Sequence, residues 1–345
     1  MPYRMFIEKD TSDLSFAHSS SQTLRSLLCF AYLSLNGAKC FHSFLFLGVL
    51  DLHRSAMNGF PKDMELLVQL RYLTIWNYSK DFPSSICNLW GLQTIIYITC
   101  EKVVLPSNIS DLVNLRHLRT SHPYVKHKNI PFVFPSIEKL MNLQTISAVE
   151  LGDGVDSFQM CFPYIKELRC FTNSEKKNDF KSLTCLEKLK VTGFIDNHIN
   201  HISFPHALKT LTLRECGLPW SDMSIIQSLA NLQVLKLYKN AFKGRCWNTD
   251  GREFQQLKFL RLEMLDIKVW EAYSESFPCL RELVIYRCDE LEKIPLEFGG
   301  ITTLQLIDIA DCIDTNSLGE SGRRIRSLRE SAERIQEEQT YFWKL

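Results

Sequence analysis

The sequence has no excess of either charge. Forty lysine and arginine residues stand against thirty-nine aspartate and glutamate residues, which gives a net charge of +1 over 345 residues. A chain this close to neutral sets up no overall field that would attract nucleic acid or an anionic membrane. Any electrostatic recognition must therefore be local, and we expect no nucleic-acid partner.

Long apolar runs are absent as well. The most apolar stretch, Phe41 to Leu50, ends at Asp51 and has about half of the roughly 20 residues that a membrane-spanning helix needs. The first residues, with Glu8, Lys9 and Asp10, lack the apolar core of a signal peptide. We expect a cytoplasmic chain without membrane insertion, whose only membrane association would be peripheral, at the plasma membrane.

The motifs of the common catalytic and metal sites are also missing. The twelve cysteines form no CxxC pair and have no metal-ligand spacing with the nine histidines, so we expect free, reduced thiols. No phosphate-binding loop, HExxH, GxSxG or kinase motif occurs. His198 and His201 lie close in sequence, but a pair without further ligands indicates solvated loop residues. The sequence predicts no enzyme, no cofactor and no metal site.

One pattern, LxxLxL, recurs along almost the whole chain at intervals of 21 to 28 residues. Its first positions are Leu24, Leu47, Leu70, Leu92, Leu115, Leu143, Ile165, Leu186, Leu208, Leu232, Leu257, Leu280 and Leu304. Apolar residues at offsets +3 and +5 have the periodicity of a strand. Proline on the return side, as at Pro83, Pro106 and Pro295, interrupts the helical period that an all-helical repeat would need.

These units predict an α/β repeat fold, a leucine-rich-repeat solenoid of about thirteen repeats of about 23 residues each. We expect a curved horseshoe with a parallel sheet on its concave face. A single unit cannot bury enough apolar surface to offset its backbone entropy, so only stacking makes it stable. Eight residues after the first leucine, six units have asparagine or cysteine, which we expect to turn inward: Cys100, Asn173, Cys216, Asn240, Cys288 and Cys312. We expect the thiols of Cys216 and Cys288 to be buried and inert.

The two ends differ from the repeats. Residues 1–22 contain no complete unit and are predicted to be a lead-in, the remnant of a junction to another module, before the solenoid at 23–316. Residues 317–345 have apolar side chains at three- and four-residue spacing and predict an amphipathic helix that caps the core. The irregular stretch from Tyr124 to Pro135 and the long gap before Ile165 are either ligand loops or tolerated insertions.

The residues between the leucines are the candidates for binding, because they point away from the core of a solenoid. Offset +4 is basic in five of twelve repeats, at Arg119, Arg169, Lys190, Lys236 and Arg261. With strands about 4.8 Å apart, these residues predict a positive stripe roughly 30 Å long that would meet an acidic protein surface. The aromatic candidates are Tyr72, Trp76, Phe171, Tyr238 and Tyr286, bordered by Phe259. Alternatively the cations only keep the face soluble, with Glu150, Glu167, Glu215 and Glu263 cancelling much of the field.

The repeat with Leu105-Pro106-Ser107-Asn108-Ile109 on its return side resembles those of plant intracellular immune receptors. The ending, from Phe298 to Gln339 with Asp311-Cys312 and the run Ser331 to Gln339, is similar to the C-terminus of nightshade late blight resistance proteins. The resemblance implies repeats that sense a pathogen effector or a modified host protein and that hold a nucleotide-binding module inactive in the defence response. The coiled coil and the ADP/ATP site of these receptors would lie in modules that this sequence does not contain.

Two other kinds of protein also contain such repeats. A substrate adaptor for ubiquitin ligation would need a helical box before the repeats, and residues 1–22 are too short for one. A secreted receptor ectodomain would need a signal peptide and paired capping cysteines. A truncated decoy or scaffold stays open beside the immune-receptor interpretation. The sequence leaves the identity of the ligand and the oligomeric state undetermined.

Overall fold

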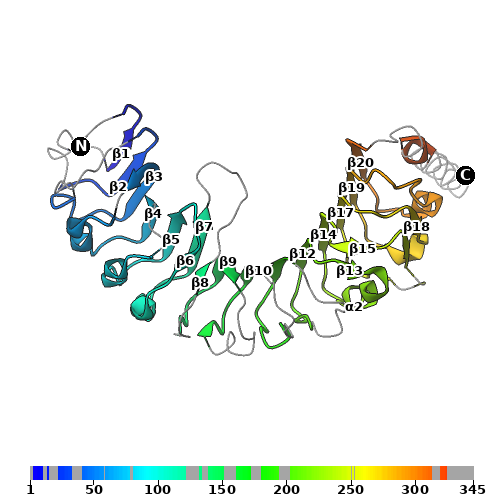
Figure 1. The fold of residues 1–345 in the computed structure, drawn as a ribbon, viewed down its shortest axis with the longest axis horizontal. Helices are drawn as coiled ribbons and strands as arrows, with labels where there is room; N and C mark the ends of the chain where they lie inside the picture. The colour runs from blue at the N-terminus through cyan, green and yellow to red at the C-terminus, as the bar shows by residue number, and fades with distance from the viewer. Residues whose placement is uncertain are drawn as a thin grey trace, which may run out of the picture. The chain divides into compact units, whose positions relative to one another are not determined.

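The computed structural model describes residues 3–10, 14, 22–32, 41–57, 59–77, 81–121, 132–133, 139–150, 161–171, 180–193, 203–249, 251, 253–312 and 319–324. The chain divides into two compact units, Met1–Phe171 and Thr172–Leu345, called unit 1 and unit 2 below. In each unit, strands line one side and short helices lie on the other (Figure 1).

A parallel sheet forms the body of unit 1. Its strands follow one another in sequence order: β1 (Arg4–Ile7), β2 (Ser26–Cys29), β3 (Val49–Met57), β4 (Tyr72–Asn77), β5 (Thr94–Ile98), β7 (His117–Ser121), β9 (Thr145–Glu150) and β10 (Glu167–Phe171). Two short strands, β6 (Val103–Val104) and β8 (Phe132–Val133), pair with each other, and β8 also pairs with β9. Each predicted repeat of this unit therefore contributes one strand to the sheet.

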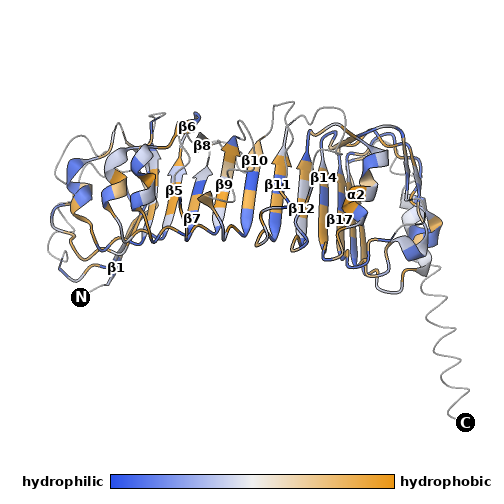
Figure 2. Ribbon diagram, turned by 90° about the horizontal axis from the view of Figure 1, so that it is seen from below, coloured by the Kyte–Doolittle hydropathy of each residue, from blue (hydrophilic) through white to orange (hydrophobic). Residues whose placement is uncertain are grey.

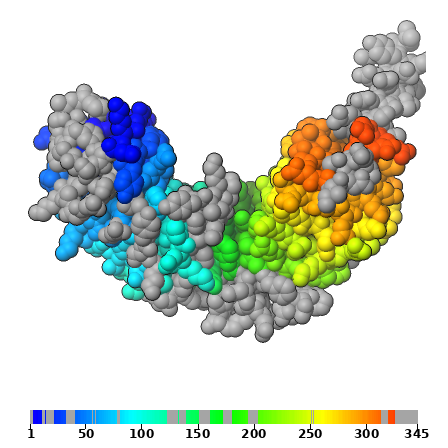
Figure 3. All heavy atoms as spheres, turned by 45° about the horizontal axis from the view of Figure 1, so that its top comes forward, coloured from blue at the N-terminus to red at the C-terminus, as the bar shows by residue number. Residues whose placement is uncertain are grey.

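Unit 2 repeats the arrangement with six strands: β11 (Lys188–Thr192), β12 (Thr210–Arg214), β14 (Val234–Tyr238), β17 (Phe259–Glu263), β19 (Glu282–Tyr286) and β20 (Leu306–Ala310). All neighbouring strands pair in parallel and in direct register. In the space-filling view the repeats of each unit appear as adjacent bands in sequence order (Figure 3). The predicted leucine-rich-repeat solenoid is confirmed.

The alternation of buried and partly exposed residues explains why these segments are strands. In β14 the side chains of Leu235 and Leu237 are buried, whereas Val234, Lys236 and Tyr238 are partly exposed. Successive side chains of a strand point to opposite faces, so the leucines at offsets +3 and +5 enter the core together. Hydrophobic and hydrophilic residues accordingly alternate along strands such as β10 and β11 (Figure 2).

The return side differs between the units. Among the described residues of unit 1 it forms three 3-10 helices, each directly after a proline: η2 (Lys62–Leu66), η3 (Ser84–Asn88) and η4 (Ser107–Asp111). In unit 2 it contains η6 (Trp220–Asp222), α2 (Met223–Gln227), η7 (Ser274–Ser276) and η8 (Leu296–Gly300). Two small parallel sheets also form there: β13 (Leu218–Pro219) with β15 (Phe242–Lys243), and β16 (Cys246–Asn248) with β18 (Val269–Glu271).

A stack of tryptophans holds the return side of unit 2 together. The ring of Trp247 lies 4.8 Å from that of Trp220 and 4.9 Å from that of Trp270, nearly parallel to both. Phe277 meets Trp247 edge-on at 6.2 Å. Each tryptophan comes from a different repeat, so the stack links three successive turns of the solenoid.

The N-terminal lead-in contributes more than the sequence predicted. Residues Arg4–Ile7 form β1, which pairs in parallel with β2 as though they belonged to a further repeat. At the other end, residues 319–324 are helical, and Gly322 lies against Ile309 of β20. The rest of the predicted capping helix lies outside the described residues, as do His198, His201 and most of the stretch from Tyr124 to Pro135.

The predicted inward turn at offset +8 is correct for three residues and wrong for two. Cys216, Cys288 and Cys312 are buried, and their thiols donate to the carbonyl oxygens of Arg214, Tyr286 and Ala310. Cys100 and Asn240 are exposed instead. Asn240 has a positive φ of 52°, whereas the three buried cysteines at the same offset do not, so the backbone of this turn differs from theirs. Asn173 lies outside the described residues.

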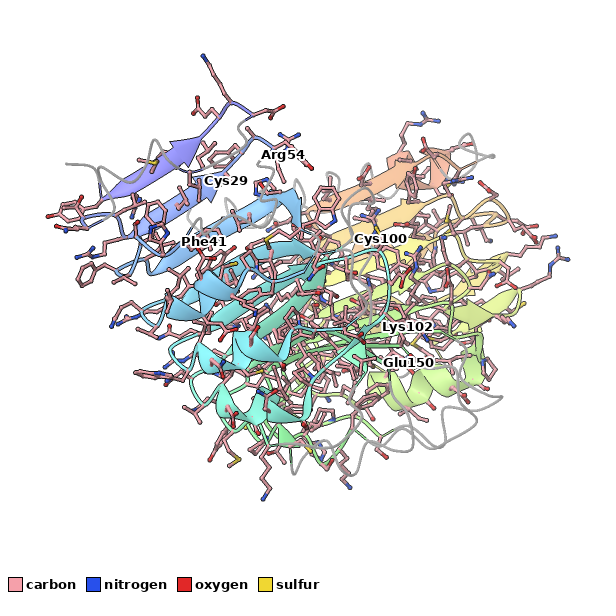
Figure 4. All side chains as sticks on the ribbon, turned by 60° about the vertical axis from the view of Figure 1, so that its left-hand side comes forward. Cys29, Phe41, Arg54, Cys100, Lys102 and Glu150 are labelled. Atoms are coloured by element: carbon pink, nitrogen blue, oxygen red, sulfur yellow. The ribbon has the colours of Figure 1, made fainter. Side chains whose placement is uncertain are left out.

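A surface ion pair spans more than one repeat of unit 1. Lys102 precedes β6 and Glu150 ends β9, and the two side chains approach each other (Figure 4), with Nζ 2.7 Å from Oε2. Glu150, which the sequence placed among residues that cancel the positive stripe, therefore pairs with Lys102.

Candidate protein-recognition surface

Each sheet has one face whose side chains are not buried in the core, and we call it the open face. It consists of the strand residues at offsets +2, +4 and +6. In unit 2 the +4 row runs in direct register from strand to strand. That row reads Lys190, Thr212, Lys236, Arg261, Val284 and Asp308.

Arg261 lies at the centre of the open face of unit 2. Its guanidinium carbon is 5.7 Å from the ring centre of Tyr238 on one neighbouring strand and 5.9 Å from that of Tyr286 on the other. Glu263 accepts hydrogen bonds from its Nε at 2.9 Å and its Nη2 at 2.7 Å. Two aromatic rings and a carboxylate thus fix the guanidinium in one orientation, which lowers the entropy it would lose on binding a partner.

Lys236 and Phe259 extend this arrangement. The Lys236 ammonium lies 5.2 Å from the Phe259 ring centre, and among the described residues no carboxylate is within 4 Å of it. Lys236, Tyr238, Phe259, Arg261 and Tyr286 form what we call the aromatic–cation patch. Arginine and aromatic side chains of this kind dominate the binding energy of protein interfaces.

Both tyrosines of the patch keep their protons at neutral pH. Burial raises the pKa of Tyr238 above its usual value. A hydrogen bond with Asp311 and the charge of that carboxylate raise the pKa of Tyr286. The patch therefore presents two neutral hydroxyl groups beside two cations.

In unit 1 the two arginines of the open face lie beside the same carboxylate. Arg169 Nη2 lies 3.0 Å from Glu167 Oε1, and Arg119 Nη2 lies 3.9 Å from Glu167 Oε2. The two guanidiniums therefore share one carboxylate. Burial, with the charges of Arg119 and Arg116, lowers the pKa of neighbouring His117, so its imidazole adds no positive charge at pH 7.

The +4 row of unit 1 is not the continuous exposed row that the sequence suggested. Thr74 and Ser147 are buried, at 3% exposure each. The pairing of β9 with β10 shifts between Leu168 and Cys170, so Ser147 and Ala148 both lie opposite Arg169. This β-bulge turns Ser147 toward β7, where its Oγ accepts the backbone N–H of Thr120 at 2.6 Å.

The ten predicted binding residues fall into two groups. In unit 1, Tyr72 and Trp76 lie on β4, Arg119 on β7, and Arg169 and Phe171 on β10. In unit 2, Lys190 lies on β11, and Lys236, Tyr238, Arg261 and Tyr286 share the aromatic–cation patch. Of these ten residues, the structure brings Arg261 into contact with Tyr238 and Tyr286, and the role of all ten in binding stays a prediction.

The buried thiols have no nucleophilic character. Burial raises the pKa of Cys29, Cys87, Cys216 and Cys288 to about 12. A thiol reacts through its thiolate, and these thiols are protonated at neutral pH. The predicted burial of Cys216 and Cys288 is confirmed, and their inertness stays a prediction that the raised pKa supports. No group of three or more metal-ligating side chains occurs among the residues that the structure describes.

The protein family of the chain follows from a match to a family model. A family model described as a leucine-rich repeat region matches residues 23–272. The chain belongs to the leucine-rich-repeat family. This match begins one residue before the first predicted repeat, at Leu24, and it includes Tyr238 and Arg261 but ends before β19 with Tyr286.

Curated relatives of this leucine-rich-repeat protein are disease-resistance proteins. A putative late blight resistance protein homologue from Solanum demissum is 32% identical over 282 residues, which cover 78% of this chain and 22% of the relative. A late blight resistance protein from the same plant is 31% identical over 284 residues, with the same coverage. The chain thus spans about a fifth of the length of the curated relatives it matches.

Among solved structures, an internalin from Listeria monocytogenes has the same fold. Its TM-score is 0.50 at 14% identity, over 91% of this chain and 85% of the internalin. At this identity the likeness concerns the fold alone. No helix in the described part of the chain is long and apolar enough to cross a membrane.

Proposed function

We propose that this chain is the protein-recognition and regulatory repeat domain of a plant disease-resistance receptor. In this role it would sense a pathogen effector or a modified host protein and restrain a nucleotide-binding switch in the defence response. The similarity to late blight resistance proteins supports the biological setting. The observation that carries the recognition role is Arg261, fixed between Tyr238 and Tyr286 on the open face.

The chain acts by binding, without catalysis and without a cofactor of its own. The thiols whose pKa burial raises to about 12 support this proposal, because they cannot serve as nucleophiles at neutral pH. The ADP or ATP of a receptor would be bound by a nucleotide-binding module of the kind found in plant immune receptors, and the repeats would contact that module or an effector in the cytoplasm.

The partner of the aromatic–cation patch is a protein surface with exposed carboxylates. Lys236 has no carboxylate partner of its own among the described residues, whereas Glu263 already neutralises Arg261. A carboxylate from a partner would pair with Lys236 while apolar atoms cover the rings of Phe259 and Tyr286.

Co-purification tests the proposal. The chain would be mixed with a separately expressed nucleotide-binding module of a late blight resistance relative, at about 50 mM and about 500 mM salt, since screening is stronger at high salt. We expect association that weakens at high salt and falls at least tenfold in the double variant Lys236→Ala/Arg261→Ala. The matched control is Lys258→Ala/Arg281→Ala, which removes two cations from the strand starts of the same unit. Absence of association would favour a decoy or scaffold that binds an effector directly.

A second experiment concerns two other cations of the predicted stripe, Arg169 of unit 1 and Lys190 of unit 2. Charge reversal at Arg169 and Lys190 in a full-length receptor chimera should disturb either autoinhibition or recognition. If both functions stay intact, the predicted stripe from Arg119 to Arg261 has no electrostatic role, and only the aromatic–cation patch would remain as a candidate.

A further inference from the structure

The turn before each strand exposes two residues at its tip. Backbone bonds such as Leu92 N to Leu89 O and Leu115 N to Leu112 O close this turn, and its two ends are buried. The tips are the residues one and two positions before the first leucine of each repeat. Because the strands are parallel, all the tips of one unit lie along the same edge of its sheet (Figure 2).

In unit 1 six of the seven tips have at least one large apolar side chain. Eight of the sixteen large hydrophobic side chains exposed among the described residues lie at or beside them, with exposures between 42% and 60%. They are Leu45, Phe46, Leu66, Val68, Trp90, Val113, Met141 and Tyr164. Together they expose on the order of 600 Å² of apolar surface, the upper end of what a soluble monomer leaves uncovered.

Inter-repeat bonds place these residues side by side. Asn114 Nδ2 donates to the Trp90 carbonyl oxygen at 3.0 Å, and Asn142 Nδ2 donates to that of Val113 at 2.8 Å. Successive tips are thus one strand spacing apart. We call this edge, with its tips and the flanking residues named below, the lateral face of unit 1.

The strand side of the lateral face is basic. Arg25, Arg71, Arg116 and Lys166 all occupy the position after the first leucine, in a column held by backbone bonds at 2.8 to 2.9 Å. None of the four has a carboxylate within 4 Å among the described residues. Across the tips lie Glu65, Asp111 and Lys139, so the described residues of the face include five cations and two carboxylates.

From these features we propose that the lateral face of unit 1 is a peripheral membrane-binding surface for an anionic lipid bilayer. Its apolar and aromatic side chains would enter the boundary between headgroups and acyl chains, and its cations would contact anionic headgroups. This surface is distinct from the open face and goes beyond the proposed recognition role.

Shape and charge favour a bilayer over a protein partner. The side chains protrude from a row of turn tips, and a fluid bilayer accepts such protrusions without a complementary partner shape. In a dimer formed through this face, two lateral faces would meet, each with three more positive than negative charges among its described residues. The two faces would therefore repel each other.

Vesicle co-sedimentation of the full chain tests this proposal. The probes are vesicles of phosphatidylcholine alone and of phosphatidylcholine with about 30% phosphatidylserine. We expect binding to the anionic vesicles that is at least tenfold stronger than to the neutral ones and that weakens at about 500 mM salt.

Two sets of variants locate the surface. Trp90→Ser/Val113→Ser/Met141→Ser and Arg71→Glu/Arg116→Glu/Lys166→Glu should each weaken binding to anionic vesicles at least tenfold. The control His206→Ser/Gln255→Ser/Thr302→Ser changes three exposed tips of unit 2 and should bind within twofold of the unchanged chain. All these side chains are exposed, so the variants should fold, which circular dichroism checks.

Three results would overturn the proposal. The chain could fail to sediment with anionic vesicles, or the apolar triple variant could bind as well as the unchanged chain. Light scattering could instead show a dimer that the apolar variant converts to a monomer, without vesicle binding, which would make the lateral face a protein interface. None of these results depends on the nucleotide-binding module, so this proposal and the recognition role can fail separately.

Discussion

The two units are built from the same repeat but differ in their surfaces: the turn tips are apolar in unit 1, whereas an aromatic–cation patch lies on the open face of unit 2. In unit 1 the turn tips are apolar, as at Trp90 and Val113, and the arginines of the open face share one carboxylate. In unit 2 the tips are polar or small, as at His206 and Gln255, and the open face has the aromatic–cation patch. Both units bury leucines at the same repeat positions. The properties of the surface therefore vary independently of the core that supports it.

The interiors of the units also differ. Unit 1 closes its return side with 3-10 helices that start after Pro61, Pro83 and Pro106, and unit 2 has two such helices after Pro219 and Pro295. Unit 2 stacks Trp220, Trp247 and Trp270 across three repeats. A proline shapes one repeat at a time, whereas a stack couples neighbours. We therefore expect the stability of unit 2 to depend more strongly on single aromatic side chains.

The largest expected effect tests that coupling. Trp247 is fully buried between two indole rings, and Trp247→Ala should lower the free energy of unfolding by about 3 to 5 kcal/mol. Hydrogen exchange should show lost protection across β16 and β18 while β4 and β5 stay protected. The matched change in unit 1, Trp90→Ala, removes an exposed ring and should stay within about 0.5 kcal/mol. Equal losses from both variants would contradict the difference between the units.

Alkaline pH should affect both units alike. Each has two thiols whose pKa burial raises from 9.0 to about 12: Cys29 and Cys87 in unit 1, Cys216 and Cys288 in unit 2. The folded-state pKa lies above the unfolded one, so this stabilisation is complete below pH 9 and is lost as the pH rises toward 12. Urea unfolding between pH 9 and 10 should lose roughly 1 kcal/mol per thiol.

The thiol variants make this expectation specific. Cys216→Ala and Cys288→Ala together should reduce the pH dependence of unit 2 and leave that of unit 1 unchanged. The exposed thiol of Cys246 offers the control, because Cys246→Ala removes no buried group. A slope that does not change in the buried double variant would mean that other groups cause the alkaline loss.

The sequence predicted the strands well because their signal is local. Leucines at offsets +3 and +5 can reach a common core only from a strand, and thirteen repetitions exclude chance. The tryptophan stack could not be predicted in this way. Trp220, Trp247 and Trp270 follow the first leucines of their repeats by 12, 15 and 13 residues, so no fixed period marks them, and contact arises only when return segments of different length are superposed.

The binding surface was predictable only in part. The +4 row identified Lys236 and Arg261, but the β-bulge at Ser147 lies in a repeat of ordinary length, from Leu143 to Ile165, and leaves no trace in the repeat spacing. The apolar tips also have a fixed offset from the first leucine, but the sequence alone does not distinguish them from core residues. Leu45, Val68, Trp90, Val113 and Met141 all stand two residues before the first leucine, where an apolar side chain is easily attributed to the core.

Positive φ angles in the turns of unit 2 offer a smaller test of the difference between the units. In unit 2, Glu215, Met264, Arg287 and Asp311 have φ between 51° and 58°, seven residues after the first leucine. Glycine adopts this conformation without a Cβ penalty, so Met264→Gly should raise the free energy of unfolding by about 0.5 to 1 kcal/mol. The control Thr302→Gly, at a position without positive φ, should lower it by a similar amount. A lower urea midpoint for Met264→Gly would show that the methionine side chain contributes more than the strain costs.

The smallest expected effect concerns the ion pair between Lys102 and Glu150 in unit 1. Its atoms lie 2.7 Å apart, but the lysine side chain is 61% exposed, and exposed pairs contribute about 0.2 to 1 kcal/mol at most because water and salt screen them. Lys102→Ala should therefore shift the urea midpoint of unit 1 only slightly and leave unit 2 unchanged. The shift should vanish at about 1 M salt, where the Debye length is about 3 Å. A shift that persists there would mean that the aliphatic part of Lys102, rather than its charge, stabilises the contact between β6 and β9.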